Sequence, residues 1–115
     1  MGQEETLLGN VREFMKDAKK AKADGSFNSA TTLFFKALAV SMDFFILKKE
    51  GFIPSNHTER FRLLKEKYPS LYRIMDKDFP LYQDSYRLKM SKQMVEVLEH
   101  DVSEVAQTAG INLNT

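Results

Sequence analysis

The first apolar pattern in the chain is that of an amphipathic helix. Apolar residues recur every three or four positions, and Glu, Lys and Asp residues lie between them. These apolar residues are Leu7, Val11, Phe14, Ala18 and Ala21. The pattern predicts a helix from about Glu5 to Ala23. The Asp24-Gly25 step then ends it, because Gly adopts the left-handed conformation without a Cβ clash.

The next segment, from Phe27 to Glu50, is apolar around most of its circumference and contains neither Pro nor Gly. Ser26 is its predicted N-cap and Gly51 its predicted stop. A helix this apolar must be covered on two or more sides, by its own neighbours or by a second subunit. The excess apolar surface of residues 33–47 therefore predicts a homodimer.

A capping box opens the third predicted helix. Asn56 is followed three residues later by Glu59, and the helix runs to Lys67 before Pro69 ends it. Ser70 can cap a further turn or two, which Pro80 is predicted to close.

The remaining pattern predicts two more helical segments. Residues 82–90 are expected to form a helix of their own, with a break at residues 89–91. The final helix carries apolar residues from Met94 to Ala109 and ends at Gly110. The polar tail of residues 112–115 is expected to fray.

These elements predict an all-α fold, an up-and-down bundle of four to five helices. No alternating run is long enough to predict a strand. A chain of 115 residues is the size of one domain with one core, so residues 1–115 are expected to form a single helical-bundle domain.

Composition narrows the function only slightly. Seventeen Lys and Arg against sixteen Asp and Glu give a net charge of +1, which favours neither nucleic acid nor an acidic membrane. The absence of Cys excludes disulfides and thiolate chemistry. The acidic start of the chain lacks the pattern of a secretory signal, and the run 33–47 is too short to span a bilayer. We therefore expect a cytoplasmic protein without a membrane partner.

The order of these signals resembles the HEPN domain family. The resemblance covers roughly residues 8–109 and rests on short sequence motifs in the first half of the chain. They are a Gly-aromatic-x-x-Ala opening (Gly25, Phe27, Ala30), Ala37 in the same helix, and the turn Gly51, Pro54, His57. The resemblance implies a helical bundle, commonly homodimeric, that often acts beside a minimal nucleotidyltransferase in prokaryotic toxin and antitoxin pairs.

Many members of that family are metal-independent ribonucleases, and their motif is an Arg followed four to six residues later by a His. That motif is absent here. No Arg precedes His57 at a suitable distance, and Arg87 is too far from His100. A Lys does not replace the imidazole, because an unperturbed Lys, with a pKa of about 10.4, stays protonated at neutral pH. The sequence therefore favours a non-catalytic member with no catalytic residue.

Two basic and aromatic clusters are candidate sites for a ligand or RNA. The first contains Arg60 and Arg62, and the second falls where HEPN enzymes keep their site. The second cluster consists of Tyr82, Tyr86, Arg87, Lys89 and Lys92. Basic residues can neutralise phosphates and aromatic rings can stack on bases. For the first cluster the favoured alternative is that its aromatic neighbours are core and its charges are solvated.

A polar line of Thr32, Lys36 and Asp43 interrupts the apolar helix. It either faces water, which is favoured, or lines a cleft. His57 is interpreted as a residue of the first helical turn that donates to a loop carbonyl, and His100 as part of a solvated face. Two isolated His residues give no metal site, and no cofactor is expected.

These observations predict a dimeric, non-catalytic HEPN-like module. Its expected partner is a protein of the nucleotidyltransferase type, or a nucleotide or RNA. The alternatives are a divergent ribonuclease of the toxin type that uses Tyr86, Arg87 and Lys89, and an unrelated helical interaction module.

Overall fold

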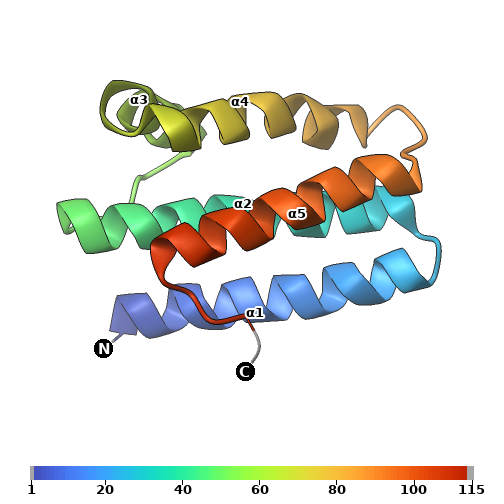
Figure 1. Cartoon of the computed structure of the whole chain (residues 1–115), viewed down its shortest axis with the longest axis horizontal. Helices are drawn as coiled ribbons and strands as arrows, with labels where there is room; N and C mark the ends of the chain where they lie inside the picture. The colour runs from blue at the N-terminus through green and yellow to red at the C-terminus, as the bar shows by residue number, and fades with distance from the viewer. Residues whose placement is uncertain (1, 114–115) are drawn as a thin grey trace.

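The computed structural model describes residues 2–113 and contains, in that range, five helices and no strand. The helices are α1 (Gly2–Ala23), α2 (Phe27–Glu50), α3 (His57–Lys67), α4 (Pro69–Asp84) and α5 (Lys92–Ala109). Four of them, α1, α2, α4 and α5, run alternately up and down, and α3 crosses one end as a short connector (Figure 1). The prediction of an all-α bundle is confirmed.

Helix α2 is the centre of the bundle and packs against α1, α4 and α5. Its length and composition alone would suit a membrane span, but most of its residues are buried inside the bundle. The chain itself therefore covers the apolar surface of residues 33–47 that suggested a second subunit. The homodimer stays a prediction, and this helix no longer supports it.

Most of the predicted helix ends are confirmed. Gly51 is left-handed, with φ 87°, and donates its N–H to Leu47 O, and Gly110 ends α5 in the same conformation. Asn56 Oδ1 accepts a hydrogen bond from Glu59 N at 2.9 Å, and the Glu59 carboxylate accepts one from the backbone N–H of Ser55. Ser26 precedes α2 as predicted but makes no side-chain capping bond.

The predictions around Pro80 were wrong. Helix α4 runs through Pro80 to Asp84, and residues 85–91 form a loop instead of a separate helix. Pro80 removes one helical hydrogen bond, to the carbonyl of Asp76, but both residues are exposed and water can satisfy that oxygen. The neighbouring Phe79 and Tyr82 pack on other aromatic rings, which holds the helix together across the Pro.

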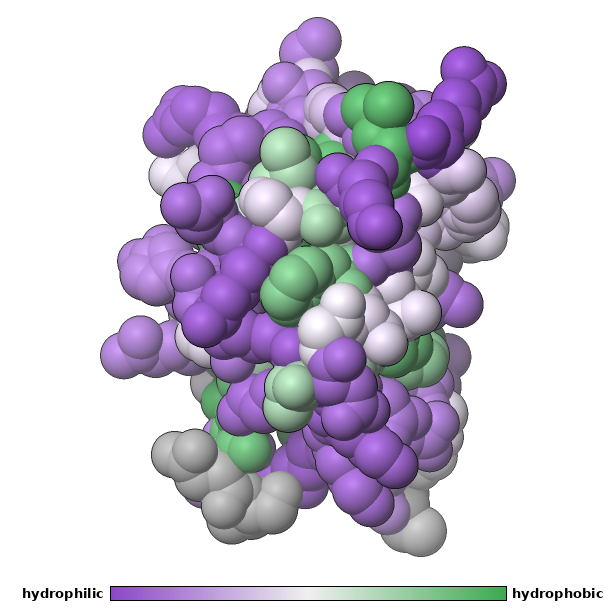
Figure 2. Space-filling model, turned by 90° about the vertical axis from the view of Figure 1, so that its right-hand side faces the viewer, coloured by the Kyte–Doolittle hydropathy of each residue, from purple (hydrophilic) through white to green (hydrophobic). Residues whose placement is uncertain are grey.

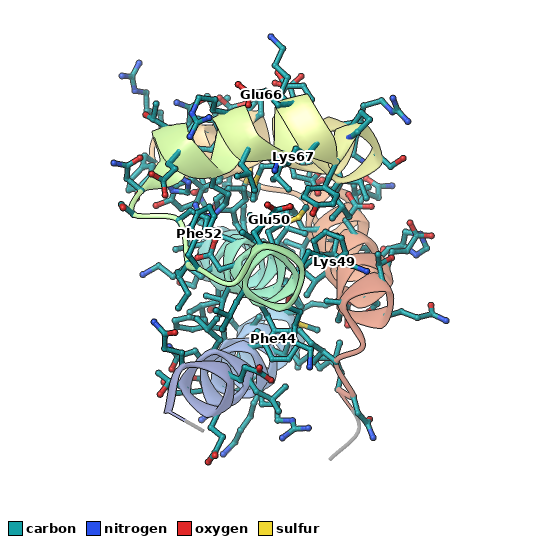
Figure 3. All side chains as sticks on the ribbon, turned by 90° about the vertical axis from the view of Figure 1, so that its left-hand side faces the viewer. Phe44, Lys49, Glu50, Phe52, Glu66 and Lys67 are labelled. Carbon is teal, nitrogen blue, oxygen red and sulfur yellow. The ribbon has the colours of Figure 1, made fainter. Side chains whose placement is uncertain are left out.

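The C-terminal end of α2 is fixed to the end of α3. Glu50 accepts hydrogen bonds from Lys67 Nζ, at 3.0 Å, and from the Tyr68 hydroxyl. Figure 3 shows Glu50 and Lys67 facing each other between the two helices. The Tyr68 bond and then the Lys67 bond lower the pKa of Glu50. These contacts set the position of α3 over the core.

Two residues of the tail after α5, Asn112 and Leu113, contact the rest of the bundle. The Arg12 side chain donates to the Asn112 carbonyl at 3.0 Å and 3.3 Å, and Leu113 packs on the core. The expected fraying is therefore wrong for these two residues. Residues 114 and 115 lie outside the described range.

One side chain from α2 positions the loop of residues 85–91. The Asn28 amide donates to Ser85 O at 2.8 Å and to Leu88 O at 2.7 Å, and its carbonyl accepts from Met90 N at 3.0 Å. The loop carries Tyr86 and leads into α5. Asn28 thus fixes the second predicted cluster to the start of the central helix.

We expect Asn28→Ala to lower the free energy of unfolding by about 1–3 kcal/mol, because three hydrogen bonds to the loop backbone are lost. Urea unfolding followed by circular dichroism measures this loss, and amide exchange at Met90 should accelerate. Asn10→Ala, at an exposed position of α1, is the control and should change stability by less than about 0.5 kcal/mol. Equal stability of the two variants would contradict the role of Asn28.

Candidate functional site

A buried ion pair connects the central helix to α3. Arg60 Nε lies 2.7 Å from Asp43 Oδ1, and Arg60 Nη2 lies 2.9 Å from Asp43 Oδ2, a bidentate geometry. The two residues are 8% and 7% exposed. The expectation that the charge of Arg60 is solvated was therefore wrong, as was a water-facing position for Asp43. Because Asp43 neutralises the guanidinium, Arg60 is not a free phosphate ligand.

His57 extends this pair toward the surface. Its Nδ1 lies 2.6 Å from Arg60 Nη1. A guanidinium only donates hydrogen bonds, so Nδ1 accepts and the ring proton of the neutral imidazole lies on Nε2. Burial, and next the charge of Arg60, lower the pKa of His57, while Asp43 opposes them. The earlier interpretation of His57 as a donor to a loop carbonyl is replaced by a bond from Arg60.

Aromatic rings from α2, α3 and α4 lie beside the imidazole of His57, a residue that is exposed to solvent. Phe35 stacks on Tyr82 with ring centroids 4.5 Å apart and an interplanar angle of 14°. Phe79 lies 5.5 Å from the His57 ring. The Tyr82 hydroxyl lies 2.8 Å from that of Tyr86, and this bond, together with burial, raises the pKa of Tyr82. The site therefore has flat apolar walls and a pair of hydroxyls at one side.

These groups line an open cavity of about 180 Å³, here called the His57 pocket. It is lined by Phe14 from α1, by Phe35, Lys36, Ala39 and Val40 from α2, by His57 and Arg60 from α3, and by Tyr82 from α4. Lys36 is exposed, and its ammonium lies 5.9 Å from the centroid of the Phe14 ring. The pocket thus combines one free cation, one imidazole and aromatic surface.

The predicted polar line divides among three environments. Thr32 is half-buried, and its hydroxyl lies 3.5 Å from that of Ser85 on the other side of the α2 and α4 contact. Lys36 reaches the His57 pocket, and Asp43 holds Arg60. The line therefore faces α4 and α3, and only Lys36 keeps the exposure expected of a water-facing stripe.

The remaining predicted site residues lie outside the pocket lining. Arg62 is exposed and 3.4 Å from Glu66 on its own helix. Arg87 and Lys89 are exposed in the loop of residues 85–91, and Lys92 begins α5. Tyr86, which is 71% exposed, joins this loop to Tyr82 through its hydroxyl. The structure thus brings Tyr82, Lys36 and Arg60 together and leaves the other cations at the surface.

Sequence reasoning missed the connection between Asp43, Arg60 and His57. The HEPN ribonuclease motif has an Arg before a His, whereas here the His comes first and the Arg follows three residues later on the same helix. Residues three apart are neighbours on a helix surface. A His-x-x-Arg spacing, together with a single Asp in an otherwise apolar run, was the signal that could have found this connection.

A larger hollow lies elsewhere and is lined by three Lys side chains, Lys19, Lys22 and Lys92, and by the carboxylates Glu96 and Glu99. It has a volume of about 530 Å³ and lies at the end of the bundle where α1 meets α2 and α5 begins. Lys22 lies 2.7 Å from Glu99 and 3.5 Å from Glu96, so these charges are paired, whereas Lys19 and the predicted site residue Lys92 form no ion pair within residues 2–113. Figure 2 shows this end, where hydrophilic side chains surround a smaller hydrophobic patch.

Across residues 2–113, no group of three or more His, Asp or Glu side chains is placed to hold a metal ion. His100 lies 3.4 Å from Glu104 on an exposed face of α5, as its sequence context predicted. No family model, curated protein or solved structure matches the chain.

Proposed function

We propose that this chain is a non-catalytic, HEPN-like helical module that binds single-stranded RNA through the His57 pocket. The supporting observation is that Lys36, His57 and Tyr82 line one cavity, with the ring of Tyr82 backed by the buried ring of Phe35. Single-stranded nucleic acid is commonly bound by aromatic rings that stack on bases and cations that neutralise the backbone.

The size and charge of the pocket favour a strand over a free nucleotide. At about 180 Å³ it is smaller than the 300–1,000 Å³ or so typical of small-molecule sites, so it can take part of one nucleotide only. The charges of Arg60 and Asp43 cancel, which leaves the single charge of Lys36. One positive charge matches one phosphodiester, whereas a nucleoside triphosphate carries about four negative charges. Arg87 and Lys89 are exposed in the same loop as Tyr86 and are available to bind the phosphates of neighbouring nucleotides in the RNA strand.

The protonation of His57 supports binding without cleavage. A general base needs a free lone pair within reach of the substrate. On His57 the lone pair of Nδ1 accepts from Arg60, and Nε2 carries the proton. The imidazole can therefore donate a hydrogen bond to a phosphate oxygen, but it cannot accept a proton from a ribose hydroxyl in this arrangement.

A divergent ribonuclease is the second candidate, favoured by the 2.6 Å contact between an Arg and a His in the same pocket. Cleavage would require His57 to exchange its bond to Arg60 for one to the ribose hydroxyl. A nucleotidyltransferase partner and a homodimer remain proposals that follow from the HEPN resemblance. Exposed apolar residues such as Met94 and Val97 on α5 are available for either contact.

We expect Lys36→Ala to weaken binding of a fluorescently labelled single-stranded RNA by about three- to tenfold. It should also reduce the slope of log K against log salt by about 0.7, the change for one phosphate contact on a single strand. Fluorescence anisotropy at several salt concentrations measures both effects. The matched control is Lys20→Ala, an exposed Lys on α1 outside the pocket lining, which should leave the slope unchanged.

Wild-type protein that does not bind RNA would refute the proposal, as would equal effects of the two Lys variants. Electrophoresis of the recovered RNA separates the two candidates. Intact RNA supports the non-catalytic module, whereas cleavage that His57→Ala abolishes would establish the ribonuclease.

A further inference from the structure

Two buried carboxylates face each other across the contact between α4 and α5. Asp78 of α4 is fully buried, and Asp101 of α5 is 4% exposed. Neither oxygen of Asp78 receives a hydrogen bond from a donor in residues 2–113. The cation at this site is Lys77, whose Nζ lies 2.9 Å from Asp101 Oδ2 and 3.9 Å from Asp78 Oδ1. One ammonium thus serves two carboxylates.

This arrangement is unfavourable if both carboxylates are ionised. A buried ion without a partner carries a large desolvation penalty, and two adjacent anions also repel each other. A proton on Asp78 removes the second negative charge and converts an acceptor into a donor aimed at Asp101. Lys77 then pairs with the one remaining anion. Protonation therefore accounts for the oxygens of Asp78 that otherwise lack a partner.

The electrostatic surroundings also favour a proton on Asp78. Burial, followed by the hydrogen bond to Asp101 and its charge, raises the pKa of Asp78 to about 8, while Lys77 opposes this shift. On α5, Glu104 contributes to the raised pKa of Lys77. Helices α2 and α3 also pack on α4. Their buried charged residues are Asp43 and Arg60, which are paired with each other.

We propose that Asp78 and Asp101 share one proton across the contact between α4 and α5, and that this proton is a structural ligand that holds the two helices together. Loss of the proton in mildly alkaline solution leaves two buried anions against one cation and loosens α4 from α5. The same helix carries Tyr82 four residues after Asp78, so the wall of the His57 pocket moves with α4. This last consequence rests on the proposed function, whereas the proton site does not.

The expected pH dependence has a definite sign. An Asp in the unfolded chain loses its proton near pH 3.9, whereas Asp78 in the folded chain keeps it up to about pH 8. Between these values the folded state binds one proton more than the unfolded state, so stability falls as pH rises. The unfolding equilibrium constant should increase by up to about tenfold per pH unit in this window and level off above it.

Asp78→Asn tests the proposal, because an amide has nearly the shape of a protonated carboxyl and donates a hydrogen bond at every pH. Urea unfolding of the wild type and the variant between pH 5 and pH 9 should show a falling midpoint for the wild type. The contribution of Asp78 should be absent from the variant, and the variant should be the more stable of the two at pH 8. The matched control is Asp76→Asn, an exposed site on the same helix, which should keep the wild-type profile.

A carbon-13 NMR titration of the Asp side-chain carboxyls supplies a direct readout. The wild type should show one carboxyl that titrates near pH 8, and this signal should disappear in Asp78→Asn. A titration of Asp78 below pH 5, or parallel stability profiles of wild type and Asp78→Asn, would overturn the proposal. If Asp78→Asn does not fold, the wild-type titration still decides. These readouts use no RNA, so their failure is distinguishable from failure of the proposed function.

Discussion

Asp43→Ala is expected to lower the free energy of unfolding by about 3–5 kcal/mol, because it leaves the guanidinium of Arg60 buried without its carboxylate. The loss comes mainly from the desolvated charge that remains, not from the attraction that is removed. For a chain of 115 residues the melting temperature should fall by more than about 10 °C. Thermal and urea unfolding followed by circular dichroism measure the two quantities.

The double variant Asp43→Leu with Arg60→Met isolates this cause. It removes both charges and fills the space with apolar side chains, so most of the lost stability should return. Arg62→Ala is the control for a simple loss of an Arg on α3. Arg62 lies at the surface 3.4 Å from Glu66, and exposed pairs contribute about 0–1 kcal/mol. A small effect of Asp43→Ala, or a double variant as unstable as the single one, would contradict the argument.

Local signals were enough to predict most of the bundle. The end of α2 follows from Gly51, and the start of α3 follows from the capping pair Asn56 and Glu59. These ends depend on a few neighbouring residues, so a single sequence contains the information. Pro80 was misjudged because the packing of its aromatic neighbours, which comes from distant segments, outweighs the local preference.

The candidate site depends on contacts between distant segments, and it was predicted only in part. Tyr82 and Lys36 were identified from their chemistry, but nothing in their spacing shows that they share a pocket. The partner of Arg60 lies 17 positions earlier in the chain. Asp78 and Asp101 look like ordinary surface residues of two amphipathic helices in the sequence. Their burial is set by the way α4 packs on α5, which periodicity alone does not determine.

Phe35→Ala is expected to combine a large loss of stability with a specific change in the site. Phe35 is 1% exposed, and truncation of a buried Phe costs about 3–5 kcal/mol. Its ring also stacks on Tyr82 and lies 6.0 Å from the ring of His57. Because burial is the main cause of the lowered pKa of His57, a wider, wetter pocket should raise that pKa toward the ordinary value of about 6.5.

The neighbouring Phe34→Ala provides a matched comparison. Phe34 is fully buried on the same helix, points about 100° away, and makes none of these ring contacts among the described residues. Both variants should lose similar stability by urea unfolding, but only Phe35→Ala should shift the His57 ring titration observed by proton NMR. If Phe35→Ala is too unstable, Phe35→Leu should shift the titration in the same direction by less. A His57 titration that is equally shifted in the Phe34 variant would show that general loosening of the core, and not the wall of the pocket, controls the imidazole.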